Sequence, residues 1–333
     1  MQKLTSKKLL NTLIKTIIGG LLIWAIYRQV FARQDASVLW QGLVDQFVHP
    51  NLYWLVVVLL MVPVNISLEA MKWKVLIRQF LNIKFVKVVK AVLSGITIAI
   101  FTPNRVGEYG GRILFVPAEH NWKAVIATLV GSLAQLLIIL SAGLIGLIVT
   151  YQHLLPSELN VLPLIISMGM VVVVLMVFCF FNIDLLVPIV KRIPFVNYFR
   201  KHLKHLAVLR NYENKELWEA IIFAFLRYLT YTLQYYFLLK FYGIPVPFFI
   251  GLAGIATIFF VQASIPLPPV MGLLARGEIA LFIWGFFSED QVAILAATFT
   301  LFVINIAIPA LLGMAFIVQA NILKSLGYEN GKD

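Results

Sequence analysis

The chain is poor in the residues that catalytic and metal sites use most. Cys179 is the only cysteine among 333 residues and lies in an apolar stretch, which excludes a disulfide framework and a thiolate metal site. The five histidines fall in expected loops or at helix ends. No HExxH, GxSxG, GxxxxGKS or GxxxxGKT motif is present. The sequence therefore predicts no catalytic residue, no metal site and no cofactor.

Charge is also scarce. Charged residues make up 13% of the chain and hydrophobic residues 61%, against roughly 25% and 45–50% in soluble proteins. The longest polar stretch, 182–216, is too short for an independent soluble domain, which needs about 50 residues. The sequence thus predicts a single membrane domain over 1–333. Its net charge of +12 is explained by contacts with anionic lipid headgroups, and no nucleic-acid motif accompanies it.

Six apolar runs are near or above the ~20 residues that cross a hydrocarbon core. They cover residues 9–31, 52–68, 122–151, 159–181, 217–242 and 291–319. We interpret the first as a retained span, since it exceeds the roughly 7–15 apolar residues of a cleaved signal peptide. The fold class expected is therefore an all-α integral membrane protein with about six full transmembrane helices.

Two further pairs of apolar segments are each split by helix breakers and ionised residues. The first pair is 88–101 with 110–116, and the second is 247–262 with 272–287. Each piece is too short to cross comfortably, and broken backbone at membrane depth persists only where protein or a watery cavity covers it. We therefore expect two re-entrant helical hairpins. The predicted hairpin breakers are Pro103, Gly107, Pro266, Pro268, Pro269, Gly272 and Gly277.

The distribution of Lys and Arg predicts the orientation. Segments 69–90 and 182–216 are rich in both residues, whereas 151–158 and 243–248 contain neither. Because cytoplasmic loops are enriched in Lys and Arg, we expect the first two segments and both termini to face the cytoplasm. The protein is then a multi-pass component of the cell (cytoplasmic or inner) membrane.

This orientation predicts that the two parts of the chain cross the membrane in opposite senses. Segments 52–151 and 217–319 are the expected halves of an inverted repeat, joined through the basic connection 182–216. The dipeptide Gly-Glu recurs at 107–108 and 277–278, which is 278 − 108 = 170 residues apart. The alternative is that the dipeptide recurs by chance and that the breakers form ordinary loops.

The ionised residues of the hairpins predict an anion-binding site. Arg105 and Arg112 flank Glu108, and Arg227 is a cation in the middle of a span whose one acidic residue, Glu219, is eight positions away. Guanidinium groups stay charged when buried and bind phosphate oxygens bidentately. The alternative is that Arg and Glu neutralise each other and only hold the hairpin together. The predicted headgroup-binding residues are Arg105, Glu108, Arg112, Arg227, Arg276 and Glu278.

Three motifs resemble a known family, the membrane domain of lysylphosphatidylglycerol synthases and its stand-alone flippase-like relatives. They are Glu69-Ala70-Met71-Lys72-Trp73, the segment 102–108 with Arg112, and the proline-rich segment 264–272 followed by Gly277-Glu278. The last departs from the family pattern, since Pro269, Val270 and Met271 stand where small residues are expected. The resemblance implies a lipid flippase that moves an anionic phospholipid or a polyprenyl-phosphate lipid between leaflets. In the family, lysyl transfer belongs to a separate soluble domain, which these 333 residues do not contain.

Other functions stay open at this point. An intramembrane glutamate could act as a base in lipid-linked sugar or aminoacyl-lipid transfer, and the chain could instead be an accessory subunit of a membrane enzyme. The expected partners are anionic membrane lipids, with a homodimer or a partner enzyme left open. Asn65, Gln135 and Asn305 could line the same cavity, although single amides within spans more often bond neighbouring helices.

Overall fold

The computed structural model describes residues 9–21, 24, 51–100, 102, 105–154, 162–185, 204–265, 269–325 and 327. Within these residues the regular structure is entirely helical, which confirms the predicted all-α class. Four helices are long and apolar enough to cross a membrane, so the protein is a multi-pass membrane protein. They are Leu52–Ile77, Ala118–His153, Pro163–Phe181 and Gln291–Gln319.

The described helices follow the predicted apolar runs in order. They are α3 (Leu52–Ile77), α4 (Phe85–Ala99), α5 (Gly107–Ile113), α6 (Asn121–Leu154), α7 (Leu162–Phe181), η5 (Lys204–Asn211), α10 (Asn214–Phe241), α11 (Phe248–Ser264), α12 (Pro269–Trp284), α13 (Gln291–Phe302), α14 (Ile308–Gln319) and α15 (Ile322–Ser325). A π-helical turn, η6 (Val303–Ala307), joins α13 to α14.

Three predicted spans differ in the structure. The first is described as a shorter apolar helix over Leu9–Leu21, and most of its remaining predicted residues lie outside the described part of the chain. The fifth corresponds to α10, which includes Arg227 and Lys240 and is not among the four strongly apolar helices. The second, α3, continues past residue 68 to Ile77. Residues 69–77 are therefore helical and not part of a loop, and Glu69 and Lys72 within them are buried by charged partners. That this end of α3 faces the cytoplasm stays a prediction.

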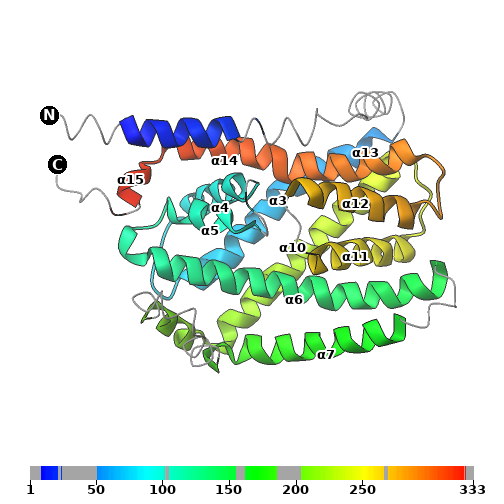
Figure 1. The fold of residues 1–333 in the computed structure, drawn as a ribbon, viewed down its shortest axis with the longest axis horizontal. Coiled ribbons are helices and arrows are strands. Elements are labelled where there is room, and N and C mark those ends of the chain that lie inside the picture. The colour runs from blue at the N-terminus through cyan, green and yellow to red at the C-terminus, as the bar shows by residue number, and fades with distance from the viewer. Residues whose placement is uncertain are drawn as a thin grey trace.

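The two predicted hairpins lie at opposite ends of the molecule. Figure 1 shows α4 and α5 together toward one end of the long axis, and α11 and α12 toward the other. α14 packs against α4, and α6 packs against α11. The division into inverted halves over 52–151 and 217–319 stays a prediction.

Several predicted breakers behave differently in the structure. Gly107 begins α5, and Pro269 begins α12. Gly272 and Gly277 do not interrupt a helix, because α12 continues through both positions. Pro103, Pro266 and Pro268 lie outside the described residues.

Glycines allow α5 to lie directly on the backbone of α4. A Cβ atom added to Gly111 would overlap the Ser94 carbonyl oxygen and come within 2.5 Å of Gly95 Cα. One added to Gly107 would lie 2.7 Å from the Ile98 carbonyl carbon. Small residues permit such close approach between membrane helices. The approach sets the position of the neighbouring residues of α5, which carry the charges.

The end of α3 and the start of α10 meet near one end of the predicted fifth span. Arg78 Nη1 lies 2.9 Å from Glu219 Oε2, and Tyr212 donates a hydrogen bond to the Leu76 carbonyl over 3.0 Å. The hydrogen bond with Glu219 is the main cause that raises the pKa of Arg78, and burial raises the pKa of the Tyr212 phenol. These contacts place parts of the two basic segments at the same end of the molecule, while its cytoplasmic location stays a prediction.

Candidate functional site

Glu69 of α3 is the centre of a buried network of charges. Its Oε1 atom lies 2.6 Å from Arg112 Nη2, and its Oε2 atom lies 2.7 Å from Lys72 Nζ and 3.3 Å from Arg227 Nε. The Glu69 side chain is only 9% exposed. One carboxylate therefore meets three cations that come from its own helix, from α5 and from α10.

Arg112 joins this centre to the first hairpin. Its guanidinium also pairs with Glu108, one helical turn earlier in α5. The side chain is 2% exposed, and its Cζ atom lies 5.4 Å from the centre of the Trp73 ring. Trp73 is held in turn by a hydrogen bond from Nε1 to Thr128 Oγ1 over 2.9 Å. Arg112 is thus fixed by α3 from two sides, and its Nε atom is buried without a hydrogen-bond partner.

Gln135 of α6 holds two of the cations side by side. Its Oε1 atom accepts hydrogen bonds from Lys72 Nζ over 3.4 Å and from Arg227 Nη1 over 3.2 Å. Its Nε2 atom donates to the Ala224 carbonyl of α10 over 3.3 Å. An amide oxygen accepts hydrogen bonds without cancelling either positive charge. The contact therefore orders the cations and leaves their charge in place.

Arg105 lies at the outer side of the network. Its Nε atom is 3.5 Å from Glu108 Oε2, and its side chain is 47% exposed, whereas that of Glu108 is 12% exposed. Arg105 has a φ of 59°, in the left-handed region that residues with a Cβ atom rarely adopt. The backbone turn before α5 therefore presents this guanidinium at the surface of the site.

The network carries a surplus of positive charge. Its four cations and two carboxylates give a formal charge of 4 − 2 = +2. Charge without a compensating partner is costly within a membrane, so ionised residues there commonly belong to functional sites. The arrangement is therefore suited to an anion. The members are Glu69, Lys72, Arg105, Glu108, Arg112 and Arg227.

The structure brings together four of the six residues predicted for the site, namely Arg105, Glu108, Arg112 and Arg227. It places the other two elsewhere. Arg276 of α12 is buried, and its described partners, Gln262 and Tyr231, are neutral, whereas Glu278 is exposed on the same helix.

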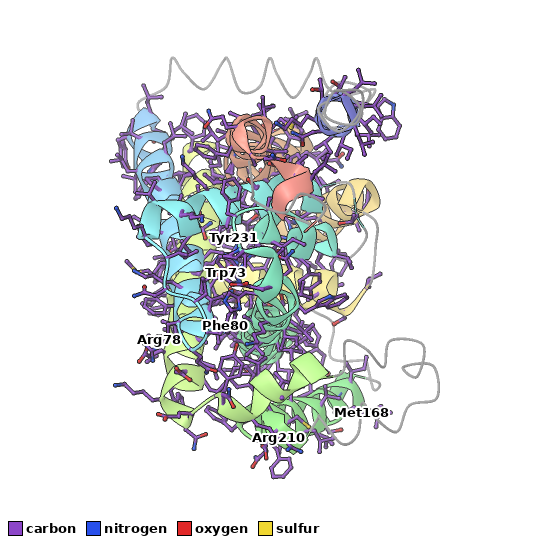
Figure 2. The ribbon with its side chains drawn as sticks, turned by 90° about the vertical axis from the view of Figure 1, so that its left-hand side faces the viewer. Trp73, Arg78, Phe80, Met168, Arg210 and Tyr231 are labelled. Carbon is purple, nitrogen blue, oxygen red and sulfur yellow. The ribbon has the colours of Figure 1, made fainter. Side chains whose placement is uncertain are left out.

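Sequence reasoning did not assign Glu69 and Lys72 to the site. Their signal is an acid and a base at i, i+3 directly before Trp73, a pattern that reads as a solvated helix end until partners on other helices are known. Figure 2 shows Trp73 near the middle of the molecule, with Arg78 lower down and nearer the edge. Lys72 is buried whereas Arg78, six residues later at the end of α3, is exposed, so the transition from buried to exposed charge takes less than about two turns.

The predicted amides have separate roles. Gln135 belongs to the network, whereas Asn65 Nδ2 donates to Asn305 Oδ1 over 2.8 Å and thereby links α3 to η6. Within the described residues, no cluster of three His, Cys, Asp or Glu side chains could hold a metal ion.

One family model, described as the lysylphosphatidylglycerol synthase TM region, matches residues 12–313. No curated protein and no solved structure matches the chain. The matched segment includes every residue of the charged network, and the family indicates a membrane function related to lipids. The chain belongs to the lysylphosphatidylglycerol synthase transmembrane-region family.

Proposed function

We propose that the protein is a lipid translocase and that the charged network around Glu69 binds the anionic headgroup of its lipid. The observation that carries the proposal is the formal charge of +2 in a site whose central side chains are buried. An anion with one or two negative charges would balance that surplus. The phosphate of a phospholipid or of a polyprenyl-phosphate lipid has this charge.

The donor groups of the site fit a phosphate better than a small inorganic anion such as chloride. Arg112 and Arg227 are guanidiniums, which present parallel N–H groups to two oxygens of one phosphate. Among the described residues, Arg112 Nε is a buried donor without a hydrogen-bond partner, which an oxyanion in the site would satisfy. Arg105, which is exposed, is placed to meet the headgroup before the buried arginines do.

The ion pairs favour an electrostatic role for the carboxylates over a catalytic one. A general base must be free to accept a proton from its substrate. Glu108 instead pairs with both Arg105 and Arg112, and Glu69 pairs with three cations. These contacts support the view that both carboxylates hold the arginines in position, and we propose that the protein itself performs no covalent chemistry.

The proposal is tested by the lipids that the protein retains. Wild-type protein and Arg105→Ala are purified from the same membranes, and their bound lipids are compared with the bulk lipid by mass spectrometry. Lys84→Ala is the matched control, because Lys84 is an exposed cation that precedes α4. We expect anionic lipid to be enriched in the wild type and in Lys84→Ala, and to fall about tenfold in Arg105→Ala. Equal retention by both variants would contradict the proposal.

A further inference from the structure

Arg276 of α12 is a buried cation with neutral neighbours. Its Nε atom donates to Gln262 Oε1 over 2.8 Å, its Nη1 atom lies 3.5 Å from the Tyr231 hydroxyl, and its Cζ atom lies 5.9 Å from the centre of the Phe259 ring. The residue is only 9% exposed. Among the residues that the structure describes, no carboxylate forms an ion pair with it.

The nearest acidic residue in sequence does not balance this charge. Glu278 follows Arg276 by two positions, and residues two apart on a helix face different sides. Arg276 is accordingly buried while Glu278 is exposed. A buried cation without a counter-charge is costly, so the surroundings of Arg276 are incomplete without an anion.

Arg276 lies outside the charged network but close to it. Tyr231, which contacts Arg276, lies one helical turn after Arg227 on α10. Figure 2 shows Tyr231 above Trp73, the residue that packs on Arg112. Arg276 belongs to the second hairpin, whereas Arg105 and Arg112 belong to the first. Arg276 of the second hairpin and the charged network, to which the first hairpin contributes Arg105 and Arg112, therefore contact α10 within one turn of each other.

We propose that Arg276, with Gln262 and Tyr231, forms a second oxyanion site that takes the singly charged phosphodiester of a lipid. The identification of the anion as a lipid headgroup rests on the proposed function. The formal charge of this site is +1, because its other two members are neutral, and a phosphodiester carries one negative charge. The guanidinium has five donors, and among the described contacts only those on Nε and Nη1 are used. The hydroxyl of Tyr231 adds a further donor.

The competing role for Arg276 is a purely structural one, since its bond to Gln262 joins α12 to α11. Gln262→Glu separates the two roles. The substitution keeps the α11–α12 contact and turns it into an ion pair, but it brings the charge of the site to zero. Gln152→Glu, at an exposed position near the end of α6, is the matched control.

The measurement is the number of phosphatidylglycerol molecules retained in phosphatidylcholine nanodiscs, determined by native mass spectrometry. We expect the wild type and Gln152→Glu to retain two phosphatidylglycerol molecules. Gln262→Glu should bind the second molecule about tenfold more weakly and therefore retain only one. Retention of both by Gln262→Glu would overturn the proposal and assign Arg276 a structural role. Tyr231→Phe provides a second test that keeps the cation, and we expect it to weaken the same equivalent several-fold.

Two further experiments are needed. Competition with inorganic phosphate tests whether the bound anion is a lipid headgroup, and Arg112→Gln tests the proposed function separately from the second site. Excess inorganic phosphate should not displace phosphatidylglycerol, because free phosphate lacks acyl chains; its displacement of the lipid would overturn the assignment to a lipid headgroup. Arg112→Gln should remove the other equivalent. If Arg112→Gln removes one lipid and Gln262→Glu removes none, the second site fails while the proposed function stands. If neither variant loses lipid, both fail.

Discussion

Glu69 and Arg112 are 43 positions apart in the sequence, and the hydrogen bond between them is 2.6 Å long and buried. The bond joins α3 to the short helix of the first hairpin. Because Glu69 also pairs with Arg227 of α10, a single carboxylate connects the hairpin to two long helices. The charged network is thus both a candidate binding site and a structural junction.

The first prediction follows from this junction. Glu69→Gln removes the charge that three cations share and leaves them buried together. Breaking a buried ion pair costs about 3–5 kcal/mol, so we expect a large fall in the thermal unfolding midpoint of the protein in detergent. Glu219→Gln is the control, because Glu219 pairs with the exposed Arg78 and such pairs contribute about 1 kcal/mol or less. Similar midpoints for both variants would show that Glu69 is not a structural junction.

The second prediction concerns the approach of α5 to α4. Gly111→Ala would force a methyl group into the backbone around Ser94 and Gly95, and we expect it to destabilise the protein by about 1–3 kcal/mol or more. The adjacent Gly110 offers a matched control, since a Cβ atom there meets no atom within 4 Å. Gly110→Ala should be neutral or slightly stabilising because alanine favours the helix. Equal stabilities of the two variants, compared by thermal unfolding, would contradict the close packing.

The third prediction concerns orientation. A cysteine at Asn82 should be cytoplasmic and one at Gln152 external, each in a Cys179→Ala background. Both positions are exposed in the structure. Labelling of intact cells with a membrane-impermeant thiol reagent should modify only the cysteine at position 152. Labelling of both positions from the same side would rule out the predicted topology.

The fourth prediction concerns alkaline pH. Burial raises the pKa of Tyr212 above its ordinary value near 10, so the folded protein favours the neutral phenol. The stability that this provides is complete below about pH 10 and is lost as the pH rises toward the folded-state pKa. Tyr212→Phe removes the hydrogen bond to the Leu76 carbonyl and should cost about 1 kcal/mol at pH 8. Its unfolding midpoint should then decline less steeply than that of the wild type between pH 9 and about 11, whereas parallel curves would show that ionisation of Tyr212 does not limit stability there.

Much of the site could be predicted because its members are conspicuous in apolar surroundings. Arg105, Glu108 and Arg112 interrupt a hydrophobic segment at helical spacing, and Arg227 lies mid-way along α10 with no other ionised residue within seven positions. Each is costly to bury unless it has a function or a partner. The sequence alone therefore indicated an anion site formed by the first hairpin and this span.

The rest of the site could not be predicted, because its residues are buried by contacts with other helices that the local sequence pattern does not show. Glu69 and Lys72 fall at the point where the hydropathy of α3 decreases, so counting basic residues assigned them to a loop. They are buried because Arg112 and Arg227 reach them from other helices. Glu278 repeats the Gly-Glu dipeptide, yet α12 continues through Gly277 and turns this carboxylate outward. A repeated dipeptide does not determine which side of a helix faces the interior.

We propose that the charged network recognises an anionic lipid headgroup and passes it between leaflets. Lipid exchange in reconstituted vesicles measures this transfer. Fluorescent phosphatidylglycerol and phosphatidylcholine are placed in matched vesicles with wild-type protein, Glu108→Gln or Lys84→Gln, and the fraction that becomes accessible to an external quencher is followed over time. We predict that the wild type and Lys84→Gln move phosphatidylglycerol faster than phosphatidylcholine. Glu108→Gln leaves Arg105 and Arg112 without their shared carboxylate, so it should retain more phosphatidylglycerol and release it about tenfold more slowly. Equal rates for the two lipids in the wild type, together with unchanged exchange in Glu108→Gln, would show that the network does not select or move an anionic lipid.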